Sequence, residues 1–199
     1  GGDSWTTAAG DTNNAGLTAG APAIRIDSVV SQLTAGDTVY IDAGTFDEYD
    51  TLTISVGPVR IYGVDSSLTI VDWGDSSAAS YNAIHAVGAN RITVQDLWVR
   101  NGRRGVLFQN VDTSAIRRVR ASACDVGILL EWGIYNDVVE TCYSHQNAWA
   151  GILLSDADGN TVAGNRAYFN AQIGVLVGWG SDTNLLTGNT FDSNLNEGL

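Results

Sequence analysis

The second half of the chain repeats a short glycine-led motif at a nearly constant spacing. The motif is a glycine followed by Val or Ile, then Leu, then another apolar residue. Its four complete copies and the start of a fifth begin at Gly105, Gly127, Gly151, Gly174 and Gly198. The intervals between these glycines are 22, 24, 23 and 24 residues. A fixed period of this length indicates stacked structural units, because each unit buries its apolar face against the next one.

A period of about 23 residues is compatible with leucine-rich repeats and with β-solenoids. The units here lack the L-x-x-L-x-L-x-x-N pattern of leucine-rich repeats and consist of short β-branched runs separated by Gly, Asn and Asp. Strands of roughly three to five residues joined by tight turns fit the coil of a β-solenoid. In that fold each coil hydrogen-bonds to the next at a spacing of about 4.8 Å. The repeat therefore predicts an all-β, parallel solenoid.

Two kinds of position within the repeat are predicted to lie inside the solenoid. The first and third residues after each glycine share a face, because side chains alternate along a strand. These residues are apolar in every copy: Val106 and Phe108, Ile128 and Leu130, Ile152 and Leu154, Val175 and Val177. The fourth residue before the glycine is Asn in most copies: Asn101, Asn147, Asn170 and Asn194. We expect these amides to stack at an inward turn and to hydrogen-bond to the coils above and below.

The pattern resembles that of the right-handed parallel β-helix superfamily with PbH1-type repeats, which includes pectate lyases, alginate epimerases and many surface proteins. The resemblance rests on the G-[VI]-L-[FLV] motifs and on the N-x-x-x-x-N pairs Asn165/Asn170 and Asn189/Asn194. Residues 36–48, GDTVYIDAGTFDE, are similar to the first strand of such proteins. The resemblance covers residues 11–199 and implies a right-handed, single-stranded parallel β-helix. It specifies the fold well and the activity poorly.

The N-terminal part of the chain is expected to cover one end of the solenoid. Ile26, Val29, Val30 and Leu33 have helical spacing and Gly36 follows them, which predicts an amphipathic capping helix. Such a helix protects the first strand edge and the core. The stretch 72–82 is polar and is predicted to be a protruding loop. Predicted strands of this half are 38–41, 51–54, 59–62, 68–71, 83–86 and 92–94.

The prediction divides the chain into two parts. Residues 1–36 form an N-terminal loop and the capping helix, and residues 37–199 form the coils. The sequence stops one residue into the next repeated strand, so we expect the C-terminal end of the solenoid to be uncapped. Because an uncovered end exposes core and strand edge, we expect either a longer parent β-helix or another chain at this end.

The charge of the chain argues against several classes of function. Ten basic residues, all of them Arg, stand against 22 acidic residues, for a formal net charge of −12. This balance disfavours nucleic-acid binding, which depends on basic residues against phosphates. It also disfavours an anionic membrane surface, and no apolar run is long enough to insert into a membrane. The absence of Lys removes mechanisms that need a lysine base or a P-loop lysine.

Arginine is concentrated in one part of this acidic chain. Six of the ten arginines lie between residues 100 and 120, and they include Arg103 and Arg104. Guanidinium groups pair with carboxylates in bidentate fashion, so this arginine belt is a candidate grip for an acidic polysaccharide. Some polysaccharide lyases of the resembled superfamily use Arg as the base. The alternative is a solvated surface on which the arginines pair with Asp96, Asp112 and Asp125.

Tryptophan marks a second candidate site for carbohydrate. Trp132 and Trp179 each lie five residues after a repeat glycine and two coils apart, so stacking would place them about 10 Å from each other on one face. Asp156 falls between them, and Trp149 lies two residues before its glycine. Exposed aromatic rings beside a carboxylate suit the stacking of sugar rings. The alternative is aromatic packing that covers the turns or contacts a partner.

The second residue after the glycine is leucine in all four complete copies. Alternation along a strand points these side chains outward, away from the core. Four stacked leucines exposed to water would form an apolar patch of the kind that marks an interface. The alternative is burial under another part of the same chain. We name this set the leucine column: Leu107, Leu129, Leu153 and Leu176.

A candidate calcium loop lies near the N-terminus. Asp11 and Asn13 belong to a segment, DTNNAG, that resembles the D-x-N-x-x-G part of such loops, and hard oxygen ligands suit Ca²⁺. The bidentate Glu of a complete loop is absent, because Pro22 stands at its position. A plain turn is therefore the alternative to a metal site.

The histidines and cysteines carry no recognisable motif. His85 and His145 lack metal-type neighbours in sequence, so we expect ordinary surface or turn residues. Cys124 and Cys142 occupy different columns of the stack, and a disulfide needs Cα atoms within about 7 Å. We therefore expect two free thiols, of which at least one is buried.

Two functional hypotheses follow from these features. The first is a non-catalytic extracellular or cell-surface module with a structural, adhesive or carbohydrate-contacting role. Its partners would be a polysaccharide or other protein subunits, including end-to-end or lateral self-association. The alternative is a lyase or epimerase acting on an acidic polysaccharide, with the arginine belt as its grip. The chain lacks the D-P-H signature of the epimerases, which favours the first hypothesis.

Overall fold

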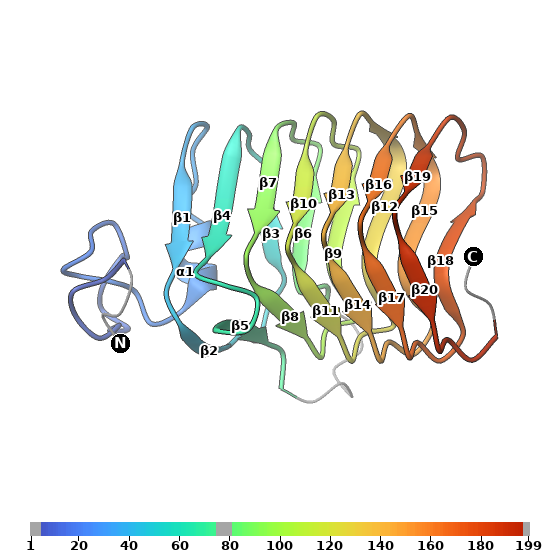
Figure 1. Ribbon diagram of the computed structural model, residues 1–199. Helices are drawn as coiled ribbons and strands as arrows, with labels where there is room; N and C mark the ends of the chain where they lie inside the picture. The colour runs from blue at the N-terminus through green and yellow to red at the C-terminus, as the bar shows by residue number, and fades with distance from the viewer. Residues whose placement is uncertain (1–4, 75–80, 197–199) are drawn as a thin grey trace.

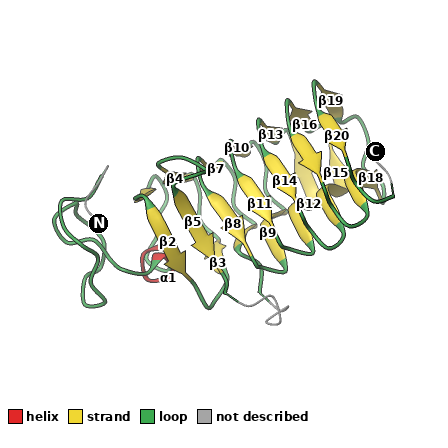
Figure 2. Ribbon diagram, turned by 60° about the horizontal axis from the view of Figure 1, so that its bottom comes forward, coloured by secondary structure: helices red, strands yellow, loops and turns green. Residues whose placement is uncertain are grey.

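The computed structural model describes residues 5–74 and 81–196, which wind as a right-handed parallel β-solenoid (Figure 1). Each coil contributes short strands to parallel sheets that run the length of the molecule (Figure 2). The fold class expected from the repeat is confirmed. Within the described ranges no helix is long and apolar enough to cross a membrane.

Three sheets form the walls of the solenoid, and each has its strands in order along the axis. The first sheet contains β1 (Thr38–Ile41), β4 (Val59–Gly63), β7 (Ile92–Gln95), β10 (Ala115–Arg117), β13 (Val138–Glu140), β16 (Thr161–Ala163) and β19 (Leu185–Thr187). The second sheet contains β2 (Gly44–Asp47), β5 (Thr69–Asp72), β8 (Trp98–Arg100), β11 (Arg120–Ser122), β14 (Tyr143–His145), β17 (Arg166–Tyr168) and β20 (Thr190–Asp192). The third sheet contains β3 (Leu52–Ile54), β6 (Ile84–Val87), β9 (Arg104–Gln109), β12 (Val126–Tyr135), β15 (Ala150–Asp158) and β18 (Ile173–Gly178).

The repeat glycines stack in one column at the start of the third sheet. Ile152 pairs with Ile128 in the coil before it and with Val175 in the coil after it, which places the preceding glycines in line. The column is glycine because the backbones approach closely there. A Cβ added to Gly151 would lie 2.5 Å from the carbonyl oxygen of Gly174, which no real side chain tolerates. The spacing in the sequence therefore reports a steric requirement.

The predicted inward positions fill the core. Seven of these eight apolar residues belong to one continuous buried cluster, and Val177, in the coil of β18, is partly buried against it. The prediction from strand alternation is confirmed. The predicted strands of the first half are also found, with no end shifted by more than one residue, whereas β2 was not predicted as a strand of its own.

Three of the four asparagines expected in the ladder form it, whereas Asn101 lies one residue before this column and donates Nδ2 to Asp72 Oδ1. The backbone N–H of Asn147 donates to Oδ1 of Asn170 at 3.1 Å, and that of Asn170 donates to Oδ1 of Asn194 at 3.1 Å. The ladder ends at Cys124, whose N–H donates to Asn147 Oδ1 but whose side chain has no amide to continue the row. A second ladder of the same kind runs through Cys142, Asn165 and Asn189.

A third ladder was not predicted from the sequence, because its members differ in residue type. Ser114 donates its N–H to Asp137 Oδ1 at 2.7 Å, Asp137 donates to Asn160 Oδ1 at 2.9 Å, and Asn160 donates to Asn184 Oδ1 at 2.9 Å. Asn160 also uses Nδ2 to reach the carbonyl of Ile134. Asp137 has no such amide hydrogen, and among the described residues its buried Oδ2 has no hydrogen-bond partner.

The N-terminal cap is present but shorter than expected. The helix α1 (Ile26–Val30) packs against β1 and β3 at the first coil, with Ile26 and Val30 buried. Glu48, which ends the GDTVYIDAGTFDE segment, is buried and accepts the N–H of Ile26 at 2.7 Å through Oε1. This carboxylate satisfies one free N–H at the start of the helix. Two expectations, the loop within 75–80 and the fifth repeat glycine Gly198, lie outside the described residues.

We predict that Asp137→Asn stabilises the protein in a pH-dependent way. Burial raises the pKa of the Asp137 carboxyl to about 7, far above its ordinary value. The protonated Asp137 carboxyl therefore makes its full contribution to the free energy of unfolding below the ordinary pKa of about 3.9. This contribution is lost as the pH rises through about 7, because the buried group then becomes charged. Urea unfolding at pH 8 should show a gain of up to about 4 kcal/mol for the variant. Near pH 4 the gain should shrink, and an equal gain at both pH values would contradict this account.

We predict that Gly151→Ala destabilises the protein by roughly 1–3 kcal/mol, because the new methyl group collides with the next coil. Gly178→Ala is the matched control, because nothing lies within 4 Å of a Cβ added there. Thermal and urea unfolding of both variants test this prediction. Equal effects at the two positions would show that close approach of the coils does not explain the glycine column.

Candidate functional site

An open groove of about 540 Å³ crosses the outer face of the third sheet. It contains all six residues that the sequence marked as candidates for carbohydrate contact. The residues that line the groove are Arg103, Arg104, Asp125, Val126, Leu129, Glu131, Trp132, Trp149, Leu153, Ser155, Asp156 and Trp179. The structure therefore brings together two candidate sites, the tryptophans and part of the arginine belt, that were separate in the sequence analysis.

Parallel pairing places the two walls of the groove at opposite ends of the strands. Arg104 pairs with Val126, and Val126 pairs with Ala150, so residues at the beginnings of β9, β12 and β15 lie in one row. Glu131 pairs with Ser155 just before the register between β12 and β15 shifts. The beginnings of the strands thus form one wall, and the residues around this register shift form the other.

Left-handed residues within β12 and β15 and directly after β18 build the second wall. Trp132, Asp156 and Trp179 have φ values of 59°, 52° and 51°, and they follow paired residues in successive coils. The N–H of Asp156 donates to the carbonyl of Trp179 at 3.1 Å. The same backbone turn in each coil therefore sets these three side chains in one column, as the spacing predicted.

Three tryptophan rings are accessible around the groove. Trp132 is 58% exposed and Trp179 is 61% exposed, whereas Trp149 is half-buried. The rings of Trp149 and Trp179 meet edge to face, with centroids 6.3 Å apart. Large exposed aromatic faces in a groove are unusual for a side chain that stabilises only its own fold. They offer flat apolar surfaces for a ligand.

The arginines of the groove are free of ion pairs within the part of the chain that the structure describes. Burial lowers the pKa of Arg104, and so does the neighbouring charge of Arg103, while Glu131 and Asp125 act in the opposite direction. A guanidinium remains charged at neutral pH. The groove thus holds two cations without a close partner, within electrostatic reach of two carboxylates.

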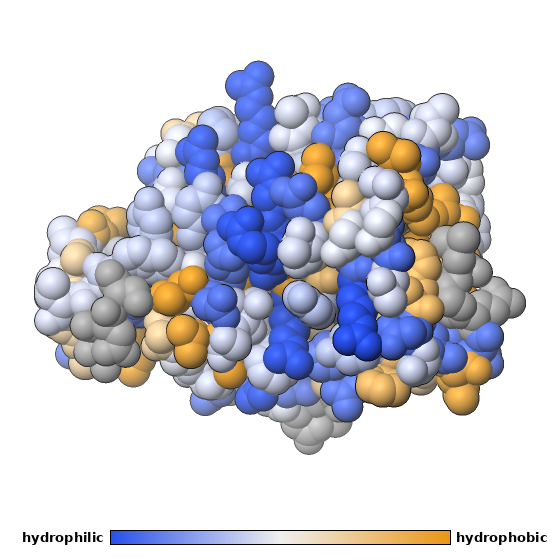
Figure 3. Space-filling model, viewed as in Figure 1, coloured by the Kyte–Doolittle hydropathy of each residue, from blue (hydrophilic) through white to orange (hydrophobic). Residues whose placement is uncertain are grey.

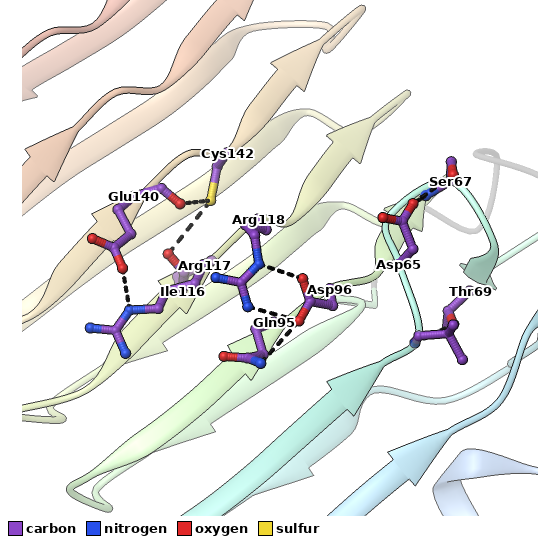
Figure 4. A network of polar contacts seen from close by, with 11 residues as sticks. Asp65, Ser67, Thr69, Gln95, Asp96, Ile116, Arg117, Arg118, Glu140 and Cys142 are labelled. Carbon is purple, nitrogen blue, oxygen red and sulfur yellow. Dashed lines mark hydrogen bonds and ion pairs between the residues drawn. The ribbon is translucent and has the colours of Figure 1, made fainter. Parts of the chain in front are cut away.

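The other four arginines of the belt do not belong to the groove. Arg118 pairs with Asp96 at 2.6 Å, Arg117 pairs with Glu140, and both pairs lie on the first sheet (Figure 4). The face over this sheet is largely hydrophilic in its middle (Figure 3). Arg100 pairs with Asp72 on the second sheet. Arg118 thus forms the expected pair with Asp96, whereas Arg117 and Arg100 pair with carboxylates other than the expected Asp112 and Asp125.

Arg120 is held by rings on the second sheet. Its guanidinium lies 4.5 Å from the centroid of the Trp98 ring, and Nε donates to Nε2 of His145 at 2.9 Å. His145 is buried and stacks on Tyr168 with centroids 4.9 Å apart. Burial lowers the pKa of His145, and the charge of Arg120 acts in the same direction. The cluster is a packed part of the surface rather than a cavity.

The leucine column corrects one expectation. Its side chains point away from the main core, as alternation predicted, but Leu107, Leu129 and Leu153 are only 2%, 2% and 3% exposed. They form a second apolar cluster, against which Trp149 and Leu176 pack. The expected exposed patch is therefore wrong, because side chains from both ends of the strands rise beside the leucines and cover them. Leu129 and Leu153 line the groove, and burial within the same chain, which was the alternative, is what the structure shows for the first three leucines.

Three polar residues of the groove were not selected from the sequence as site residues. Glu131 directly precedes Trp132 and Ser155 directly precedes Asp156 in the sequence, whereas pairing of the coils brings Asp125 into the same groove. Glu131 also accepts a hydrogen bond from Gln109 at 3.3 Å, and Gln109 contacts His85 at 3.2 Å. For Glu131 and Ser155, the signal that could have found them was their position beside two selected site residues.

The N-terminal calcium candidate forms a turn. Oδ1 of Asp11 accepts the backbone N–H of Asn13 at 2.8 Å and its Nδ2 at 2.9 Å, and both residues are exposed. These contacts occupy a carboxylate oxygen that a calcium ion would use. Whether the segment binds Ca²⁺ stays a prediction.

Both thiols are free and buried, as expected. Burial raises the pKa values of Cys124 and Cys142 to about 12. Neither thiol is therefore a nucleophile or a ready metal ligand at neutral pH.

Comparison with protein families assigns the chain to a family. A family model described as "Periplasmic copper-binding protein (NosD)" matches residues 23–198. The chain belongs to this family. Comparison with curated proteins gives no match.

Solved structures share the fold at low sequence identity. An alginate lyase from Paenibacillus sp. str. FPU-7 is similar with a TM-score of 0.70 at 12% identity, over 82% of this chain and 62% of the lyase. The periplasmic alginate epimerase AlgG gives 0.61 at 16%, over 78% of this chain and 40% of AlgG. Pectate lyase Pel9A gives 0.61 at 14%, over 84% of this chain and 48% of Pel9A. The chain thus spans less than two thirds of each of these proteins, and the likeness shows the fold alone.

The side chains do not fit the copper site that the family name implies. Copper sites use His, Cys and Met, and this chain has two His, two Cys and no Met. Both cysteines are buried with raised pKa values, and His85 and His145 lie in different sheets. Within residues 5–74 and 81–196 there is no group of three or more His, Cys, Asp or Glu side chains that could hold a metal. We therefore assign no copper chemistry to these residues.

Proposed function

We propose that the chain is a carbohydrate-binding module built on a β-solenoid, with the groove on the third sheet as its binding site. The observation that carries this proposal is the gathering around one groove of three tryptophans and of two arginines that have no ion pair among the described residues. Sugar rings present an apolar face that stacks on aromatic rings and an edge of hydroxyl groups that hydrogen-bond to charged side chains. Both kinds of contact are available on opposite walls of this groove.

The proposed location is outside the cytoplasm, at the cell surface or in the extracellular space. The family is described as periplasmic, which supports export of the chain. An acidic surface without Lys is compatible with that location. The proposed partners are a polysaccharide or other protein subunits of an assembly that displays the groove.

A lyase or epimerase acting on an acidic polysaccharide is the second candidate. Arg104 supports it, because a cation beside Glu131 and Asp125 resembles the pairing of a carboxylate-neutralising group with a proton acceptor. Incubation with pectate and alginate, followed by ultraviolet absorbance of unsaturated products, distinguishes a lyase from a binding module. Turnover that is lost in Arg104→Gln would favour the enzyme.

We predict that removing the exposed rings abolishes binding without unfolding the protein. The double variant Trp132→Ala/Trp179→Ala should bind the glycans that the unmodified protein binds on an array at least tenfold more weakly, because each ring supplies stacking area. A glycan array followed by titration calorimetry measures this effect. Tyr143→Ala is the control, since Tyr143 is an exposed aromatic residue outside the groove. Absence of glycan binding by the unmodified protein, or equal affinities of the two variants, would contradict the proposal.

A further inference from the structure

We infer that the groove selects a glycan in which an acidic sugar is flanked by neutral sugars, and that it rejects polymers made only of uronic acids. This inference rests on the proposed function, because it names the class of ligand for the same groove. It comes from the distance along the groove between the two arginines and Asp156.

The cationic end of the groove lies in the coil of β9. Arg103 and Arg104 are adjacent there and, among the described residues, make no ion pair that would have to break before an anionic ligand binds. The only hydrogen bond that the structure shows for the Arg104 guanidinium, to Asn82, is long at 3.5 Å. Two neighbouring guanidinium groups suit one planar carboxylate. An acidic sugar would bind at this end.

The aromatic end of the groove is anionic. Asp156 lies in the column between Trp132 and Trp179. Its carboxylate reaches toward Gly180, the residue after Trp179. A uronate ring stacked on either tryptophan would bring its carboxylate toward that of Asp156, and like charges repel. A neutral sugar would instead donate a hydroxyl hydrogen bond to Asp156. The tryptophans therefore favour uncharged rings.

The two ends are far enough apart for different sugars of one chain. Asp156 is on β15, two coils beyond β9, which is about 10 Å along the axis. Trp179 follows β18, one coil further, at about 14 Å. The lining of the groove contains three carboxylates, including Asp125 and Glu131, and two guanidinium groups. A continuous polyanion would meet net negative charge, whereas a glycan with isolated acidic sugars matches both ends.

Calorimetric titration with defined hexasaccharides tests the inference. Hyaluronan and unsulfated chondroitin alternate a uronate with a neutral amino sugar, oligogalacturonate is wholly acidic, and chitohexaose is neutral. At least one of the two alternating glycans should bind at least tenfold more tightly than the other two probes. Equal or tighter binding of oligogalacturonate, or of chitohexaose, overturns the inference and leaves the proposed function intact. Absence of binding by all four probes, with no ligand on the array, overturns both.

Two variants test the charge argument separately from folding. Arg103→Gln/Arg104→Gln should reduce affinity for the alternating glycan to that for chitohexaose. Asp156→Asn should raise affinity for oligogalacturonate at least fivefold, because it removes the repulsion, and Asn tolerates the left-handed backbone of this position. A gain of binding cannot arise from misfolding. Unchanged affinity for oligogalacturonate in Asp156→Asn would overturn the inference.

Discussion

Hydrogen bonding between each strand and the same strand of the next coil is the interaction on which the rest of this structure depends. Parallel pairing in register places equivalent residues of successive coils in columns. The apolar columns form the core, and the glycine column lets the backbones approach where the second sheet turns into the third. The asparagine columns supply hydrogen bonds to buried backbone N–H groups at the turns. A change at one position therefore acts on three coils rather than one.

The columns that stabilise the coils also create the groove. A left-handed residue follows the last paired residue of this column in the coils of β9, β12, β15 and β18, so its side chain leaves the wall at the same place each time. Trp132, Asp156 and Trp179 occupy that place in three successive coils, and the leucine column below them is covered by the neighbouring side chains. The site is thus a surface feature of a regular scaffold, in which its residue types can vary without a change of fold. For this reason neither the fold nor the family identifies the ligand.

The fold could be predicted from the sequence because its determinants recur. The glycine represented by Gly151 and the alternating apolar residues after it recur in four successive coils, so their spacing identifies the core there. The third ladder was missed because Ser114, Asp137 and Asn160 share a role but not a side chain. The burial of Leu129 was missed because alternation gives the direction of a side chain and not the height of its neighbours. Asp125 joins the groove through pairing across coils, which a linear pattern does not display, whereas Glu131 stands beside Trp132 in the sequence.

The distance between equivalent residues of different coils tests directly whether the coils are stacked in register. Arg60 and Leu185 are exposed, occupy one column of the first sheet and are separated by five coil steps, which corresponds to about 24 Å. Spin labels at these two positions, in a Cys124→Ser/Cys142→Ser background, give this distance by pulsed electron resonance. The account predicts a narrow distribution near that value and a decrease of about 5 Å when the second label moves back one coil to Thr161. A broad distribution, or a distance that does not change with that move, would contradict stacking of the coils in register.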